Sequence, residues 1–364
     1  MMMKEIPIEV LEAFTTYEPS LPDHAEGEII VERISGGLIN HSFRVSCQLK
    51  PDFLLQRINK NVFLNPAHVQ ENYINIWEYA EFEFTGLRLP SPKYCGKMTT
   101  LFVDDNENYW RAFEFIEESK MFPVAVKPSQ AKATAKTFAK FTAAFNDFNI
   151  QQLREVIPGF HDLRLRYHQF EQALNGELYE RMANALPIIE ELKQRERYKH
   201  FYEIIIESDE FPKRVMHHDA KIANVLFNSK TGKVICPVDF DTVMPGYFFS
   251  DLGDMIRSMV SDKDENCTDF ESIHIRKEYY EAIIAGYLDV IGKQLTTSEI
   301  KYIHYAGLLM IYMQALRFLT DYLNGDIYYH TTHPEQNFLR AKNQLTLLQK
   351  LEQFLSQHYY FRNE

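Results

Sequence analysis

A histidine, an asparagine and three aspartates occur in a fixed order in the middle of the chain. The segment Val215–Phe227 contains the pattern His-x-Asp-x-x-x-x-Asn, with Asp219 and Asn224 between two apolar stretches. A second acidic site, Val-Asp-Phe-Asp, places Asp239 and Asp241 directly after another apolar run. This pattern puts carboxylate and carboxamide oxygens on loops at strand ends, and such oxygens bind hard divalent cations.

Phosphoryl transfer from ATP requires this set of groups. One acid accepts the proton of the acceptor hydroxyl, and oxygen ligands hold magnesium on the phosphates. We therefore predict Asp219 as the catalytic base in contact with the acceptor, and Asn224 and Asp239 as magnesium ligands. Asp241 is either a further metal ligand or orients this loop. Each residue alone fits an ordinary polar loop, because Asp and Asn favour turns; their joint order favours the catalytic interpretation.

The elements that must position these loops change in character along the chain. Strand-like runs at 28–34, 42–48, 53–58, 100–103 and 109–116 surround one helical pattern that begins with Asn65 as N-cap and Pro66 in first position. From about residue 119 helical patterns dominate, with Pro187 as a break and a strand-and-loop insert at 214–246. We predict an α+β fold of two lobes, a small β-rich lobe at 1–117 and a larger, mostly helical lobe at 118–364.

Composition narrows the class of protein. The chain has 364 residues, 45% of them hydrophobic and 25% charged, which is typical of a globular protein large enough for two lobes. Its formal charge of −12 argues against nucleic acid as a partner. The four cysteines form no CxxC pair, which favours a reducing, cytoplasmic compartment. Polar residues interrupt the apolar run 303–319, so we expect a buried helix there and no membrane partner.

The two acidic motifs resemble a known pair of signatures. His217–Asn224 and Asp239–Asp241 resemble those of the aminoglycoside phosphotransferase and choline kinase superfamily, which has a protein-kinase-like fold and uses ATP with Mg²⁺. The resemblance runs from about residue 28 to residue 350. Further segments resemble the N-acetylhexosamine 1-kinase branch, which phosphorylates the anomeric hydroxyl of an N-acetylated sugar: 34–42, 55–59, 241–246, 251–254 and 317–326.

This resemblance implies where the nucleotide binds. Ser35, Gly36, Gly37 and Asn40 correspond to the phosphate-binding loop, where backbone N–H groups approach the phosphates. Without the other motifs, two glycines between strands would fit a plain hairpin turn. The segment 110–117 is expected to be the hinge, with backbone groups of Glu114 and Phe115 bonding adenine.

One position departs from the family pattern. Protein-kinase-like enzymes carry a phosphate-binding lysine on the third strand, whereas here the strand predicted at 53–58 contains no lysine. Arg57 is the expected substitute, with Glu71 or Glu78 as its partner on the following helix; an exposed helix-face charge fits either glutamate equally well. The missing lysine is also the one argument for a non-catalytic, nucleotide-binding regulator.

The resemblance further implies that Arg317 and Tyr328 contact the acceptor. A structural ion pair between Arg317 and Asp321, at helical spacing, is the competing interpretation. Asp254 and Arg257 fit a local pair better than a binding site. The same enzyme pattern also fits other acceptors, such as an amino alcohol, homoserine or an aminoglycoside.

Overall fold

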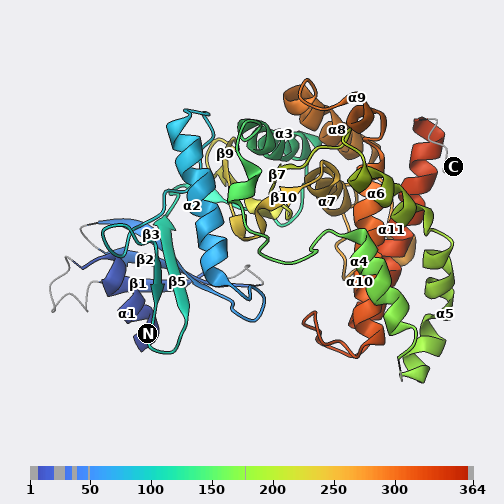
Figure 1. Ribbon diagram of the computed structural model, residues 1–364, viewed down its shortest axis with the longest axis horizontal. Coiled ribbons are helices and arrows are strands. Elements are labelled where there is room, and N and C mark those ends of the chain that lie inside the picture. The colour runs from blue at the N-terminus through green and yellow to red at the C-terminus, as the bar shows by residue number, and fades with distance from the viewer. Residues whose placement is uncertain (1–6, 20–28, 35–38, 48–49, 177, 360–364) are drawn as a thin grey trace. The chain divides into compact units, whose positions relative to one another are not determined.

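The computed structural model describes residues 7–19, 29–34, 39–47, 50–176 and 178–359. It comprises two compact units (Figure 1). The first consists of Met1–Lys120, Asp147–Pro158 and Leu226–Met244, and the second of Met121–Asn146, Gly159–Val225 and Pro245–Glu364. One unit is built on an antiparallel sheet and the other on helices, which confirms the predicted α+β class.

A five-stranded antiparallel sheet forms the frame of the first unit, in the order β1-β2-β3-β5-β4. Its strands are β1 (Ile29–Arg33), β2 (His41–Cys47), β3 (Lys50–Ile58), β4 (Leu101–Val103) and β5 (Tyr109–Glu114). Phe53 and Leu55 alternate with polar or half-buried neighbours along β3, so successive side chains reach opposite faces of the sheet. This alternation decides which side chains of β3 share a face of the sheet.

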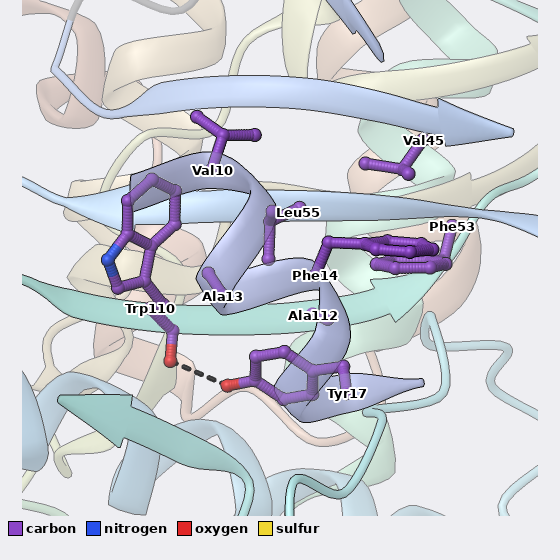
Figure 2. Close-up of a cluster of buried hydrophobic side chains, with 9 residues drawn as sticks. All are labelled: Val10, Ala13, Phe14, Tyr17, Val45, Phe53, Leu55, Trp110 and Ala112. Carbon is purple, nitrogen blue, oxygen red and sulfur yellow. Dashed lines mark hydrogen bonds between the residues drawn. The ribbon is translucent and has the colours of Figure 1, made fainter. Parts of the chain in front are cut away.

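Helix α1 (Ile8–Tyr17), which the sequence analysis did not predict, covers one face of this sheet (Figure 2). The Tyr17 hydroxyl donates to the Trp110 carbonyl at 2.6 Å, and the Phe14 and Phe53 rings stack at 5.5 Å. The buried side chains of this cluster are Val10, Ala13, Phe14, Tyr17, Val45, Phe53, Leu55, Trp110 and Ala112. This face is therefore a hydrophobic core.

Helix α2 (Pro66–Phe82) packs on the opposite face. Its Tyr73 ring meets Phe113 of β5 edge-on at 4.9 Å, and Phe113 points away from the α1 core because it alternates with Ala112. The helix begins at Pro66 as predicted, but Asn65 makes no capping hydrogen bond. The first unit is completed by a small sheet of β6 (Ser119–Lys120), β8 (Val225–Asn228) and β9 (Val234–Pro237).

The second unit is helical apart from one two-stranded sheet of β7 (Arg214–Met216) and β10 (Met244–Gly246). Its helices are α3 (Pro128–Ala144), α4 (Leu163–Ala173), α5 (Tyr179–Lys193), α6 (Arg197–Glu207), α7 (Phe249–Met259), α8 (Lys277–Ile291), α9 (Thr297–Lys301), α10 (Tyr305–Leu323) and α11 (Gln336–His358). Helix α10 packs against α11, α7 and α4. Pro187 lies inside α5, so the predicted break there is wrong.

The α7–α10 contact depends on a glycine. A Cβ on Gly253 would overlap the carbonyl oxygen of Ala306 and the side chain of Met310, so only glycine allows this approach. The apolar run that the sequence analysis considered as a membrane segment is the buried core of α10. None of the helices in the described ranges is long and apolar enough to cross a membrane.

Candidate active site

The loop 217–224 of the second unit follows β7 and is held by a buried carboxylate. Asp251 of α7 accepts the backbone N–H groups of His217 at 3.0 Å and His218 at 2.7 Å. The His217 ring packs edge-on against Phe138, with centroids 5.0 Å apart, and its Nδ1 accepts the Asp219 N–H at 3.3 Å. The backbone N–H groups of His217, His218 and Asp219 are therefore all hydrogen-bonded, which fixes the loop up to Asp219.

Asp219 is held as a carboxylate. Its Oδ2 atom accepts hydrogen bonds from Lys221 Nζ and Asn224 Nδ2, both at 2.8 Å. Burial acts to raise the pKa of Asp219, but the charges of Lys221 and His217 and the Asn224 bond outweigh burial and lower it. Its Oδ1 atom receives no hydrogen bond from the residues that the structure describes, so one oxygen remains to accept a proton.

Lys221 and Asp251 are functional candidates to which the sequence analysis assigned no role. Lys221 lies two residues after the predicted base, and this position was the only available signal for it. Asp251 lies in the segment 251–254 that carries part of the resemblance, but nothing in that segment indicated its partners His217 and His218, which lie more than thirty residues earlier in the chain. Burial raises the pKa of Asp251 to about 7.

The second acidic motif lies in the first unit, on a short 3₁₀ turn, Phe240–Thr242. Asp239 has a left-handed backbone, with φ of 68°, which is uncommon for a residue with a side chain. Asp241 is buried and uses both carboxylate oxygens, because Oδ1 accepts from Arg111 and Oδ2 accepts from Asn40. Of the two roles considered for Asp241, these bonds favour orientation of the loop over metal ligation.

The remaining metal candidates have the chemistry that Mg²⁺ requires. Asn224 directs its Nδ2 toward Asp219, and its Oδ1 accepts no hydrogen bond within the described ranges. That amide oxygen and the Asp239 carboxylate are hard oxygen donors. No group of three or more His, Cys, Asp or Glu side chains able to hold a metal occurs among the described residues. Asn224 belongs to the second unit and Asp239 to the first, and each offers an oxygen of the kind that Mg²⁺ prefers.

The nucleotide contacts predicted on β3 and α2 need a correction. Arg57 lies on the α1 face of the sheet. Its Nη1 atom is 3.8 Å from Glu9 Oε1, and its guanidinium lies over the Trp110 ring. Glu71 instead pairs with Arg154, at 3.5 Å. The predicted Arg57–Glu71 pair is wrong, because strand alternation turns Arg57 away from α2.

The structure describes the predicted hinge, but only Asn40 of the residues predicted in the glycine loop. The N–H groups of Glu114 and Phe115 donate to the carbonyls of Ser91 at 2.9 Å and Asp52 at 3.3 Å, so neither is available to donate to adenine. Ser35, Gly36 and Gly37 lie outside the described residues. Asn40 is described and donates to Asp241.

Arg317, predicted to contact the acceptor, lies among aromatic rings on α10. Its guanidinium carbon is 5.0 Å from the centroid of Phe160, and Nη2 lies 3.5 Å from the Tyr328 hydroxyl. The alternative ion pair with Asp321 is wrong: that carboxylate accepts the N–H groups of Tyr328 and Tyr329 at 2.8 and 2.9 Å. Arg317 has no carboxylate partner among the described residues.

A buried histidine pair connects this region to the catalytic loop and was missed by the sequence analysis. His218 has a φ of 63° and faces His161, with their Nδ1 atoms 3.1 Å apart. Burial, with the adjacent His218 and the charge of Arg317, holds the pKa of His161 well below its usual value. The Phe160 ring stacks on His161, with centroids 4.5 Å apart. His218, the residue before Asp219, is thus connected to Arg317 through contacts of His161 and Phe160.

Two further arginines have different surroundings. Arg257 binds Asp254 through Nε at 2.8 Å, which confirms the predicted local pair. Arg166 bonds the Phe160 carbonyl and the Gln169 side chain, and has no carboxylate partner in the described part of the chain. Burial, with the charge of Arg317, lowers the pKa of Arg166 to about 10, which leaves it charged at neutral pH. Two guanidiniums, those of Arg166 and Arg317, therefore lie close to Phe160, with Asp162 as the acidic group that acts on Arg166.

Known proteins share the family pattern and the fold of this chain. Residues 30–293 match the phosphotransferase enzyme family. An aminoglycoside phosphotransferase from Alicyclobacillus acidocaldarius is similar in structure, with a TM-score of 0.60, 15% identity and 98% of each chain covered. An ethanolamine kinase from Plasmodium vivax gives a TM-score of 0.62 at 13% identity, covering 94% of this chain and 90% of its own.

A third structure was solved with a nucleotide analogue. It is an amicoumacin kinase in complex with AMP-PNP, Ca²⁺ and its ligand, with a TM-score of 0.56, 10% identity and coverage of 95% and 96%. At identities this low, the similarity shows the fold alone. It confirms the predicted protein-kinase-like fold. The family match spans most of the chain and carries the identification: this chain belongs to the phosphotransferase enzyme family.

Proposed function

We propose that the protein transfers the γ-phosphate of MgATP to a hydroxyl of a small molecule. The observation that carries this proposal is the Asp219 carboxylate, whose Oδ2 is held by Lys221 and Asn224 and whose pKa is lowered. Such a group accepts a proton from an attacking hydroxyl. Asn224 and Asp239 are proposed to hold Mg²⁺, which neutralises phosphate charge when bound.

The proposed acceptor is an N-acetylhexosamine, phosphorylated on its anomeric oxygen. Arg317 and Tyr328 offer hydrogen-bond donors, and the aromatic rings beside them suit a sugar face. Two guanidiniums without described carboxylate partners, Arg166 and Arg317, would repel a cationic acceptor. A neutral sugar avoids this repulsion.

Amino alcohols are the second candidate class, because an ethanolamine kinase is among the structural neighbours. Such an acceptor carries an ammonium group and calls for acids or aromatic rings without adjacent arginines.

The four cysteines are free, which suits action in the cytoplasm.

The test is a panel of acceptors in an ADP-release assay with MgATP. We expect turnover with N-acetylglucosamine or N-acetylgalactosamine, and phosphorus NMR should show the new phosphate on the anomeric oxygen. Turnover only with choline, ethanolamine or homoserine would overturn the sugar assignment and retain the phosphotransferase. Nucleotide binding without turnover on any acceptor would support the regulator.

A further inference from the structure

The α2 face of the sheet carries a buried arginine on β5, at the position facing β3. Arg111 is paired in register with Gln56, and both lie on the face opposite the α1 core. Phe113, two residues further along β5, contacts Tyr73 of α2 and fixes this orientation. The third strand therefore presents a neutral glutamine on this face, and the positive charge comes from the neighbouring strand.

The guanidinium of Arg111 is fixed on two sides. Nε donates to Gln56 Oε1 at 3.1 Å, and Nη2 donates to Asp241. Gln56 is itself oriented by a 2.9 Å bond to Ser42. The Arg111 side chain is only 3% exposed, yet its Nη1 makes no hydrogen bond with any residue in the described ranges. Nη1 is not among the buried atoms that lack a partner, so it keeps contact with solvent, where a ligand can accept its hydrogen bonds.

Two neighbours of this arginine belong to segments predicted to meet the nucleotide. Asp241, its ion-pair partner, lies two residues after the proposed metal ligand Asp239. Asn40, at the end of the predicted phosphate-binding loop, donates to the other oxygen of Asp241 and accepts the Asn59 N–H at 3.0 Å. One network thus joins the arginine, the acidic loop and the end of the glycine loop.

We propose that Arg111 binds the nucleotide phosphates in place of the lysine that is absent from positions 53–58 of the third strand, and that Asp241 and Gln56 hold it in position. Lys50, at the start of β3, pairs with Glu18. This inference rests on the proposed function, since it requires an adenine nucleotide. In protein kinases an ion pair between the strand lysine and a helix glutamate does the corresponding work. A guanidinium suits the role because it retains donors for a phosphate while it is paired.

The test compares nucleotide affinities by isothermal titration calorimetry with Mg²⁺. Arg111→Met alone would leave Asp241 buried and unpaired and could unfold the chain, so the test uses Arg111→Met combined with Asp241→Asn. Asp241→Asn alone is its control, and Arg57→Met is the matched arginine control. Circular dichroism checks folding. Each protein is titrated with AMP-PNP and, by competition, with adenosine.

We expect the double variant to bind AMP-PNP at least tenfold more weakly than Asp241→Asn does, with unchanged affinity for adenosine. Arg57→Met should bind both ligands like the wild type. Equal AMP-PNP affinity in the double variant and its control would overturn the assignment of Arg111, as would a selective loss in Arg57→Met. Failure of the wild type to bind AMP-PNP would overturn the proposed function and this inference with it.

Discussion

The carboxylate of Asp251 accepts the backbone N–H of His218 at 2.7 Å, from a position 33 residues further along the chain. A second bond, from His217 at 3.0 Å, makes Asp251 the anchor of the catalytic loop. Its burial is complete, and its neighbours include the charged groups Asp254 and Asp219. This anchor makes the geometry around Asp219 sensitive to a residue that we do not expect to touch the substrate.

Asp251→Asn should weaken both folding and catalysis. An amide oxygen accepts one of the two N–H groups and leaves the other facing its NH₂, at a cost of about 1–3 kcal/mol. Urea unfolding measures the loss of stability, and steady-state kinetics should show a lower kcat with little change in the KM for ATP. An unchanged kcat would mean that the loop keeps its geometry without this anchor.

The same variant should reveal a pH dependence. The pKa of Asp251 is raised to about 7 by burial, above the value of about 4 for a free aspartate. The folded chain therefore binds an extra proton between about pH 4 and 7, and the wild-type free energy of unfolding falls as pH rises through this range. Asp251→Asn lacks this pH-dependent contribution to the free energy of unfolding. The difference in stability between the wild type and the variant should therefore be larger at pH 5 than at pH 8. A deficit that grew toward pH 8 would contradict the raised pKa.

Gly246→Ala should disturb the histidine pair beside Asp219. An added Cβ would lie 2.5 Å from His218 Cε1 and 2.6 Å from Nε2, so the ring must move. Such overpacking costs about 1–3 kcal/mol, and we expect lower thermal stability together with a lower kcat. Gly96→Ala is the matched control, because its nearest atom would be 3.8 Å away. Equal losses of thermal stability and kcat in Gly246→Ala and Gly96→Ala would contradict a specific effect on the His218 ring.

Arg317→Ala should weaken acceptor binding. Hydrogen bonds to a charged group contribute about 1.5–3 kcal/mol, so the KM for the acceptor should rise at least about tenfold. The KM for ATP should stay within about twofold of the wild type. Arg164→Ala, a half-exposed arginine of α4, serves as control. A rise in the KM for ATP alone would place Arg317 outside the acceptor site.

The local order of elements could be predicted from the sequence, but the pairing of distant residues could not. Strand alternation along β3 places Arg57 on the same face as Phe53 and Leu55, but the sequence analysis did not use it and predicted Arg57 as a phosphate ligand. Recognising Arg111 required the register of β3 against β5, which the sequence alone does not fix.

The same reasoning explains the other differences. His161 and His218 are 57 residues apart in the chain, and neither lies in a pattern that indicates the other. Conversely, the motif around Asp219 is local, and its hydrogen bonds to Lys221 and Asn224 span only two and five residues. Sites built from one loop can be predicted from spacing, whereas sites assembled from separate elements need the fold.

Asn224→Ala should raise the requirement for magnesium. The substitution removes an oxygen that accepts no hydrogen bond within the described residues, and also the 2.8 Å bond to Asp219. We expect the Mg²⁺ concentration for half-maximal activity to rise by about tenfold, the equivalent of one charged contact. A titration of activity with Mg²⁺ at saturating ATP measures it. A lower kcat with an unchanged Mg²⁺ dependence would assign Asn224 to orienting Asp219 alone.

The most direct test of the account is the single-turnover rate of Asp219→Asn with MgATP and the acceptor that the panel identifies. The amide keeps the shape of the carboxylate but cannot take a proton from the attacking hydroxyl. The account predicts a rate lower by about 10²–10⁴-fold, with the affinity for AMP-PNP and the melting temperature close to those of the wild type. A rate within a few-fold of the wild type, in a folded variant, would contradict the assignment of Asp219 as the base.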